Sequence, residues 1–242
     1  QQQYIKNLKR REDNLRDKVS KQQKELSALN KKIDDLIAYE IEQARKRAEA
    51  EARRKAEAKR KAEAKKRATN STSTSKKPAS SGGTGSKTQQ TTSSSGSWLT
   101  ASDRKLNGTF LQNKGRLPVP ITGQYRISGR FGKYNVPGLK NVTLDNKGVN
   151  YVGKPGARAR CIFDGEVTAV FQFSGSKNVL VRHGSYISVY CNLSSVIVRK
   201  GQKLKARDLI GTVQTDESGN CILHFQLRKE TTKLNPEAWI GR

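Results

Sequence analysis

The stretch NVLVRHGSYISVYCNL (178–193) contains two short runs of β-branched and aromatic residues with a glycine between them. Runs of the same kind lie on both sides of it: EVTAVFQF (166–173), LIGTVQT (209–215) and CILHFQL (221–227). Strands this short, at this spacing, are typical of hairpins in antiparallel sheets. They predict an antiparallel all-β domain of roughly 120 residues in the C-terminal half of the chain.

A heptad repeat runs through residues 5–36, and eight of its ten seam positions are apolar. The seam consists of Ile5, Glu12, Val19, Leu26 and Ile33 at one position and Leu8, Leu15, Gln22, Leu29 and Leu36 at the other. This pattern predicts a coiled coil. The partner helix is either a second copy of the chain or an antiparallel arm upstream, and the pattern leaves both open. Because the chain lacks Met and opens inside a helical pattern, we expect it to be a fragment.

Large apolar residues disappear after residue 44, and the run AEAEARRKAEAKRKAEAKKR (48–67) takes their place. Its alanines and its Glu to Lys/Arg pairs at i,i+4 favour a helix. Without an apolar stripe, this helix is either a solvated spacer or a contact to nucleic acid or an anionic surface. Residues 69–97 are rich in Ser, Thr and Gly, which predicts a flexible tether.

The predicted fold class is therefore α plus all-β, with three parts. Residues 1–68 form a coiled coil and charged helix, 69–97 a flexible linker, and 98–242 an antiparallel β-sheet domain. A short helix is expected at the start of this domain, from Ser102 to about Asn113, with Leu106 and Phe110 on one face.

The net charge of +27 and the pI of about 10.3 make a polyanion a plausible neighbour. Nucleic acid, anionic lipid and anionic wall polymer all fit that charge, but no nucleic-acid reading motif accompanies it. No run is apolar and long enough to span a bilayer. Cys161, Cys191 and Cys221 form no CxxC pair, so we expect small core residues and no structural disulfide.

Strand alternation sorts the side chains of the two most regular runs. In CILHFQLR the expected core residues are Cys221, Leu223, Phe225 and Leu227, and Ile222, His224, Gln226 and Arg228 face the other way. In YISVYCNL the expected core residues are Ile187, Val189, Cys191 and Leu193, and Tyr186, Ser188, Tyr190 and Asn192 face the other way. The two strands would then present a mixed polar surface containing Tyr190, Asn192, His224 and Arg228.

Four segments, in this order, resemble the landmarks of the LytM/lysostaphin zinc endopeptidases, which cut peptidoglycan cross-links. They are NKGVN (146–150), VRHGSYISVYCNL (181–193), VRKGQKLKARDLIGTV (198–213) and ILHFQLRKETTKLNPEAWIG (222–241). The resemblance covers 115–242. In active members the landmarks read His-x-Gly-x-Asp, Tyr-x-His and His-x-His. There the first His, the Asp and the last His bind zinc, and the other two His assist the water and the transition state.

In this chain the resemblance puts Asn146 and Asn150 at two zinc-ligand positions, and only His224 keeps a ligand type. Asn192 and Ile222 stand at the two catalytic positions. Catalytic zinc needs three protein ligands and a bound water. The resemblance therefore implies a degenerate site with no catalytic residues, no metal and no cofactor. The other histidine, His183, lies in an HG turn and is expected to be structural.

The order of coiled coil, low-complexity tether, KGRLPVPITG (114–123) and degenerate domain resembles the EnvC-type murein hydrolase activators. This resemblance implies that the coiled coil docks on an FtsEX-like membrane complex at the division site. The degenerate domain would use its vacant groove to activate N-acetylmuramoyl-L-alanine amidases. It also implies the periplasm of a Gram-negative bacterium.

Two sets of residues are candidates for this role. The degenerate groove is expected to consist of Asn146, Asn150, Asn192, Ile222 and His224. The expected partner contacts are Lys147, Tyr151, Tyr190, Gln226 and Arg228, because aromatic and Arg side chains often anchor interfaces. Two alternatives stay open: a peptidoglycan-binding module that activates nothing, and a nucleic-acid binder supported by charge alone. The sequence leaves open the amidase, the oligomeric state, the role of the cysteines and whether an upstream helix restrains the groove.

Overall fold

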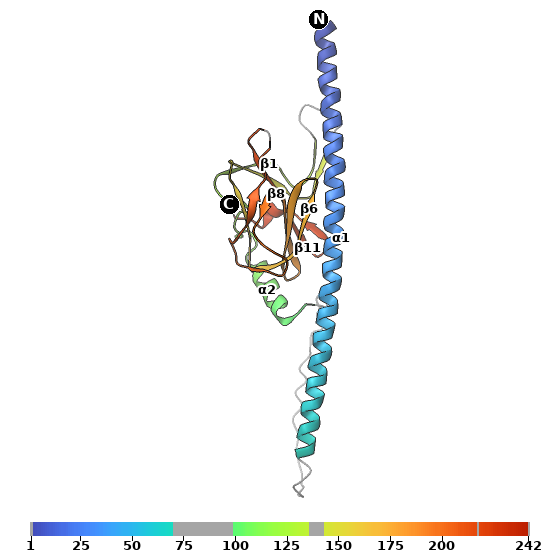
Figure 1. Ribbon diagram of the computed structural model, residues 1–242, viewed down its shortest axis with the longest axis vertical. Helices are drawn as coiled ribbons and strands as arrows, with labels where there is room; N and C mark the ends of the chain where they lie inside the picture. The colour runs from blue at the N-terminus through green and yellow to red at the C-terminus, as the bar shows by residue number, and fades with distance from the viewer. Residues whose placement is uncertain (1, 70–98, 136–142, 217, 242) are drawn as a thin grey trace, which may run out of the picture. The chain divides into compact units, whose positions relative to one another are not determined.

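The computed structural model describes residues 2–69, 99–135, 143–216 and 218–241. Residues 1–41 and 101–242 form one compact unit, and residues 42–100 form a second. The predicted tether, 69–97, lies outside the described residues except for Thr69. The predicted fold class is confirmed in its other parts, a helix at the N-terminus and an antiparallel β domain at the C-terminus (Figure 1).

Helix α1 spans Gln2–Thr69. Ion pairs at i,i+4 support its C-terminal half, including Glu42–Lys46 at 2.8 Å and Glu57–Lys61 at 2.9 Å. None of the helices in the described parts is long and apolar enough to cross a membrane. The heptad seam divides in two. Ile5 and Leu8 are exposed, and the coiled-coil pairing predicted for them stays a prediction, whereas Ile33 is fully buried against the β domain.

Helix α2 spans Ala101–Gln112, close to the predicted range. Its Phe110 is fully buried and stacks on Tyr186, with ring centroids 4.6 Å apart. The guanidinium of Arg182 donates to the Asp103 carboxylate at 3.0 Å. These contacts attach α2 to the hairpin turn that contains His183 and Gly184.

The main sheet is antiparallel, with strands in the order β1-β4-β11-β8-β7-β6-β9. Their bounds are β1 Tyr125–Gly129, β4 Val149–Gly153, β11 Cys221–Lys229, β8 Tyr186–Val196, β7 Ser176–His183, β6 Gly165–Phe173 and β9 Lys203–Leu204. Strand β10 (Leu209–Val213) pairs with β5 (Arg158–Arg160) and β8, and β12 (Thr232–Leu234) pairs with β11. Strands β2 (Gly132–Asn135) and β3 (Thr143–Asn146) form a separate hairpin, and a 3-10 helix covers Pro236–Ala238.

The sheet buries side chains on both of its faces. One face carries the main core, which includes Phe225, Leu227 and Tyr190. The other face packs against α1, where Ile33 and Ile37 meet a smaller apolar cluster. That cluster consists of Leu180, Ile187, Val189 and Cys191.

The predicted face assignment is right for β11 and wrong for most of β8. In the observed register Tyr190 lies opposite Phe225, and Val189 lies opposite Gln226. Residues directly opposite each other share a face, so Tyr190 points into the main core and Val189 points toward α1. The prediction failed because α1 makes the second face apolar as well, so hydrophobicity does not tell the two faces apart. Leu193 reaches the main core as predicted, because the strand is irregular at Asn192, whose φ is +71°.

The three cysteines are free and buried, as expected from their spacing. Cys161 and Cys221 belong to the main core, and Cys191 belongs to the cluster under α1.

We predict that a protein of residues 98–242 folds by itself. Its main core contains no residue of α1. Loss of α1 exposes Ile187, Val189 and Cys191 to water, so this protein should melt cooperatively but at a lower temperature than the full chain. Calorimetry of the two proteins measures the difference. A broad, non-cooperative transition for 98–242 would show that α1 is part of the folding unit.

Candidate binding groove

Five residues predicted to form a degenerate groove line one pocket of about 390 Å³. They are Asn146, Asn150, Asn192, Ile222 and His224. Strand pairing explains why they meet. Asn150 on β4 lies directly opposite His224 on β11, and the Asn192 amide donates to the Ile222 carbonyl at 2.7 Å.

His224 is neutral and has both ring nitrogens engaged. Its Nδ1 lies 2.7 Å from Asn150 Oδ1, and its Nε2 lies 2.9 Å from Gln226 Nε2. Since the carboxamide oxygen only accepts and the amide nitrogen only donates, Nδ1 carries the proton and Nε2 accepts. Burial, and to a smaller extent the charge of Arg228, lowers the pKa of His224 to about 4.

These residues do not fit the zinc site that the landmarks imply. Asn146 and Asn150 are neutral amides, and the lone pair of His224 Nε2 is taken by Gln226. In the described residues no three His, Cys, Asp or Glu side chains group as metal ligands. The backbone of β1 also lies close to the two carboxamides. A Cβ on Gly129 would be 2.8 Å from Asn150 Nδ2 and 3.2 Å from Asn146 Nδ2. The carboxamides therefore fill the space beside β1.

A hydrogen-bond chain leads from His224 along β11 to α1. Gln226 Oε1 accepts from Arg228 Nη2 at 2.8 Å and from Nε at 3.2 Å. Gln226 Nε2 also donates to Asn30 Oδ1 on α1 at 2.9 Å. Arg228 Nη1 pairs with Asp34 on the next turn of α1. Through Asn30 and Asp34, this hydrogen-bond chain connects the groove to α1.

Asp34 holds two cations of the β domain. Besides Arg228, it accepts from Lys233 Nζ at 3.2 Å. Burial alone would raise the pKa of the Asp34 carboxyl, but the hydrogen bonds and charges of Arg228 and Lys233 outweigh it and lower the pKa. The carboxylate is therefore ionised at neutral pH.

Three predicted partner residues are not where the sequence placed them. Arg228 was expected to border the groove at the surface, but it is fully buried and covered by α1. Tyr190 is buried in the main core, where its hydroxyl accepts from the Ile162 amide at 3.0 Å. Tyr151 lies in the same core. The register of β8 and β4 against β11 turns both rings away from the groove.

The other two predicted contacts differ in exposure. Gln226 is fully buried against α1. Lys147 is about one-third exposed and pairs with Asp145. His183 is structural in geometry: it is buried, and its ring nitrogens lie 2.8 Å from the Asp164 carbonyl and the Ser188 hydroxyl.

The sequence reading missed Asn30 and Asp34 on α1. A signal was present, because Asn30, Ile33, Asp34 and Ile37 recur at helical spacing and so share one face. A face that mixes apolar and polar residues suits a surface of the same mixed kind. Reading the segment only as a heptad hid this match to β11.

Comparison with known proteins places this region in context. Residues 145–236 match Peptidase family M23. An uncharacterized protein of Neisseria meningitidis is 33% identical over 154 residues, which cover 59% of this chain and 24% of that protein. The murein hydrolase activator NlpD of Escherichia coli is 30% identical over 98 residues, 39% of this chain and 26% of that protein. The chain thus spans about a quarter of the length of these relatives.

Among solved structures, Helicobacter pylori Csd3 is 29% identical over the aligned part, with a TM-score of 0.44. The alignment covers 52% of this chain and 35% of that one.

We predict that the chain has no tight one-to-one zinc site at neutral pH. Calorimetric titration with Zn²⁺ measures this directly. The double variant Asn146→His/Asn150→Asp is the matched comparison, because it restores three ligand types around His224 and should bind at least about tenfold more tightly. A submicromolar site in the unaltered chain that supports peptide-bond cleavage would contradict the prediction.

We predict that the protein loses stability in mild acid because of its two buried histidines. Burial lowers the pKa of both His183 and His224 from 6.5 to about 4. Between these values the unfolded chain binds more protons, so the free energy of unfolding falls as the pH drops from 6.5 toward 4. The melting temperature should fall across this window, and less steeply in His224→Gln. Equal slopes would show that His224 is not buried in its neutral form.

Proposed function

We propose that this chain is a non-catalytic activator of cell-wall amidases that hydrolyse the N-acetylmuramoyl-L-alanine bond during cell separation. The observation that carries the proposal is His224, whose two ring nitrogens are held by Asn150 and Gln226. A peptidase of this fold needs an activated water. Among the described residues no three side chains group as metal ligands, and His224 has no free ring nitrogen that could act as a base. What the groove offers instead is a pocket lined by both carboxamide and apolar side chains.

The similarity to NlpD supports the proposal of an activator, since that relative is named a murein hydrolase activator. By this proposal the chain acts in the periplasm at the division site. The exposed half of the heptad seam, which includes Ile5 and Leu8, would dock on an FtsEX-like membrane complex.

In this proposal α1 keeps the activator off. Gln226 and Arg228 face α1 and are fully buried. An amidase that docks on this face of β11 has to displace the helix first. The groove then becomes available only when α1 leaves, and a pull or a binding event on α1 would control activation.

A charge reversal on α1 tests this arrangement. Asp34→Lys removes the partner of Arg228 and Lys233 and places three cations together, so α1 should leave the groove. The Asp34 side chain is 44% exposed, so the loss of its ion pairs should destabilise the docked helix less than the loss of a fully buried pair would. We therefore expect amidase stimulation to rise about tenfold. The measurement is dye release from labelled peptidoglycan with a cognate amidase.

The control is Asp35→Lys, the same change on the exposed neighbouring position, which should leave stimulation unchanged. Dye release by the chain without any amidase would contradict a non-catalytic role. Equal stimulation by both variants would contradict occlusion by α1.

Reversing the cations beside the groove should have the opposite effect. Arg228→Glu, and less strongly Lys147→Glu, should abolish stimulation, because a partner carboxylate loses its bidentate contact. Arg228 is buried, so its reversal should also lower the melting temperature, whereas Lys147→Glu should not. Full stimulation by Lys147→Glu and by Arg228→Glu would exclude the groove as the docking surface.

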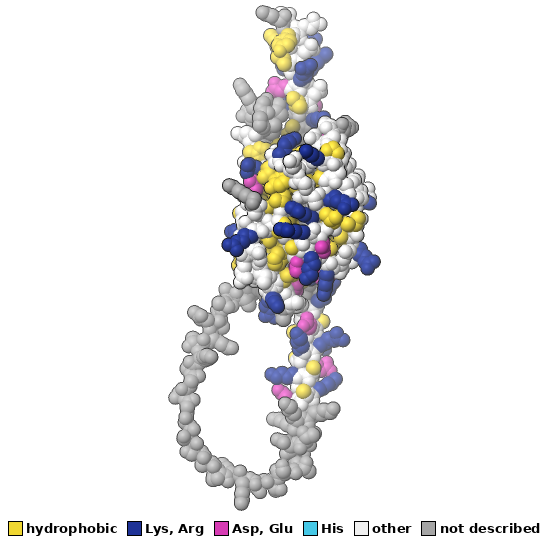
Figure 2. Space-filling model, turned by 90° about the vertical axis from the view of Figure 1, so that its left-hand side faces the viewer, with side chains coloured by type: hydrophobic (Ala, Val, Ile, Leu, Met, Phe, Trp, Pro, Cys, Tyr) yellow, Lys and Arg dark blue, Asp and Glu magenta, His cyan; other side chains and the backbone are white. Residues whose placement is uncertain are grey.

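The second candidate is a peptidoglycan-binding module that activates nothing. It is favoured by the net charge of +27 and by the Lys and Arg side chains spread over the face in Figure 2. Sedimentation with purified peptidoglycan, together with an absence of amidase stimulation in every variant, would favour this candidate.

A further inference from the structure

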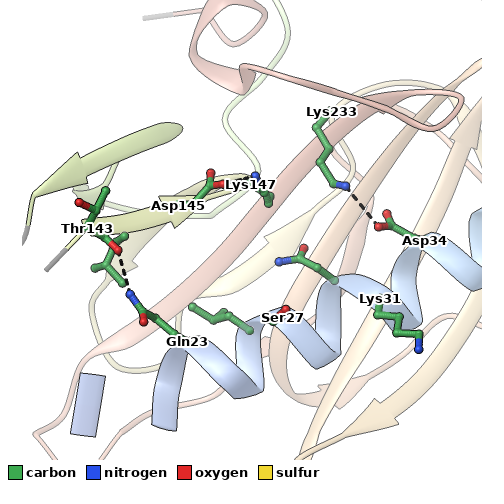
Figure 3. A pocket seen from close by; sticks show the side chains of 11 residues that line it. Gln23, Ser27, Lys31, Asp34, Thr143, Asp145, Lys147 and Lys233 are labelled. Carbon is green, nitrogen blue, oxygen red and sulfur yellow. Dashed lines mark hydrogen bonds and ion pairs between the residues drawn. The ribbon is translucent and has the colours of Figure 1, made fainter. Parts of the chain in front are cut away.

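A second cavity, of about 450 Å³, lies beside the groove between α1 and the β domain (Figure 3). Gln23, Ser27 and Asn30 of α1 line one wall. The opposite wall consists of β3 with the turn that follows it, and of Lys233 on β12. The cavity shares Leu26, Leu144 and Asp145 with the lining of the groove, so the two adjoin. None of the landmark residues Asn146, Asn150, Asn192, Ile222 and His224 lines it.

The helix is tied to the domain at both ends of this cavity. At one end Gln23 Nε2 donates to the Thr143 carbonyl at 2.9 Å, and at the other Lys233 donates to Asp34. Gln23 and Asp34 are about 16 Å apart along the axis of α1, at a rise of 1.5 Å per residue. Between them Leu26 and Leu144 line the cavity with the polar side chains, so the space has apolar and hydrogen-bonding walls.

Its charged groups favour anions. Lys147 pairs with Asp145, while Lys233 shares the Asp34 carboxylate with Arg228. Lys31 also belongs to the lining, so three lysines and two carboxylates line the cavity. Lys147 and Lys233 are 33% and 27% exposed, which leaves both ammonium groups within reach of a solute.

We propose that this cavity binds a short acidic peptide. The peptide's carboxylates would pair with Lys147 and Lys233, and its backbone would hydrogen-bond to Ser27 and the carboxamides of α1. A volume of about 450 Å³ lies within the usual range for sites of small ligands. A short peptide also matches the mixture of apolar and polar walls, which a bare inorganic anion would leave unused.

Such a ligand would hold α1 in place. Because one wall belongs to α1 and the other to the β domain, the complete site exists only when the helix is docked. Binding therefore stabilises the docked arrangement, and releasing the helix weakens binding by the same factor. The cavity is thus a place where a soluble peptide would oppose the opening of the groove.

Calorimetric titration of the full chain with acetyl-Glu-Ala-Glu-amide tests the proposal. Lys147→Gln and Lys233→Gln should each weaken binding by about fivefold, the size expected for a partly exposed ion pair. Lys200→Gln, which changes an exposed lysine elsewhere in the domain, is the matched control and should bind like the unaltered chain. The neutral peptide acetyl-Gln-Ala-Gln-amide and inorganic phosphate should both bind at least about tenfold more weakly.

Asp34→Lys distinguishes binding in the cavity from general attraction of the peptide to a cationic chain. It adds positive charge but releases α1, so the proposal predicts loss of binding, whereas attraction to net charge predicts tighter binding. Several results would overturn the proposal: no binding at millimolar peptide, equal binding of the neutral peptide or of phosphate, or unchanged binding in both Lys147→Gln and Lys233→Gln. None of these readouts depends on an amidase.

Discussion

The ion pair between Asp34 and Arg228 is the constraint on which the rest of this arrangement depends. Arg228 has no solvent exposure, and a guanidinium cannot lose its charge, so it needs hydrogen-bond acceptors on every side. Gln226 supplies one acceptor from its own strand, and α1 supplies the other. If the helix moved away, Arg228 would meet water or another anion. The helix and any acidic partner therefore compete for the same cation.

The same chain of hydrogen bonds occupies His224, the histidine of the groove. Gln226 is held by Arg228, and its amide in turn occupies the nitrogen of His224 that could otherwise bind a metal. Asn150 takes the other nitrogen. His224, Gln226 and Arg228 thus satisfy one another without an ion. The residues that match a peptidase family model thus contain a histidine with both ring nitrogens occupied.

The sequence predicted the elements well because their causes are local. Alternation in CILHFQLR identified the core residues of β11, and the landmark spacing brought Asn146, Asn150 and His224 into one pocket. It failed for Arg228, since that side chain is covered by α1, nearly two hundred residues away in the chain. It also failed for Tyr190, whose strand is apolar on both faces. The sheet is buried on both faces, so polarity alone could not assign β8. The register of β8 against β11 determines which of its side chains face the main core.

Cys191 provides the most direct test that α1 covers this face through Asp34. It lies in the cluster with Ile33 and Ile37 and is 1% exposed, whereas Cys161 and Cys221 lie in the main core. Burial raises the pKa of the Cys191 thiol to about 12, so it should resist iodoacetamide in the unaltered chain. In Asp34→Lys the account predicts rapid labelling of Cys191 while Cys161 and Cys221 stay protected. Equal labelling rates of Cys191 in both proteins, mapped by mass spectrometry, would contradict it.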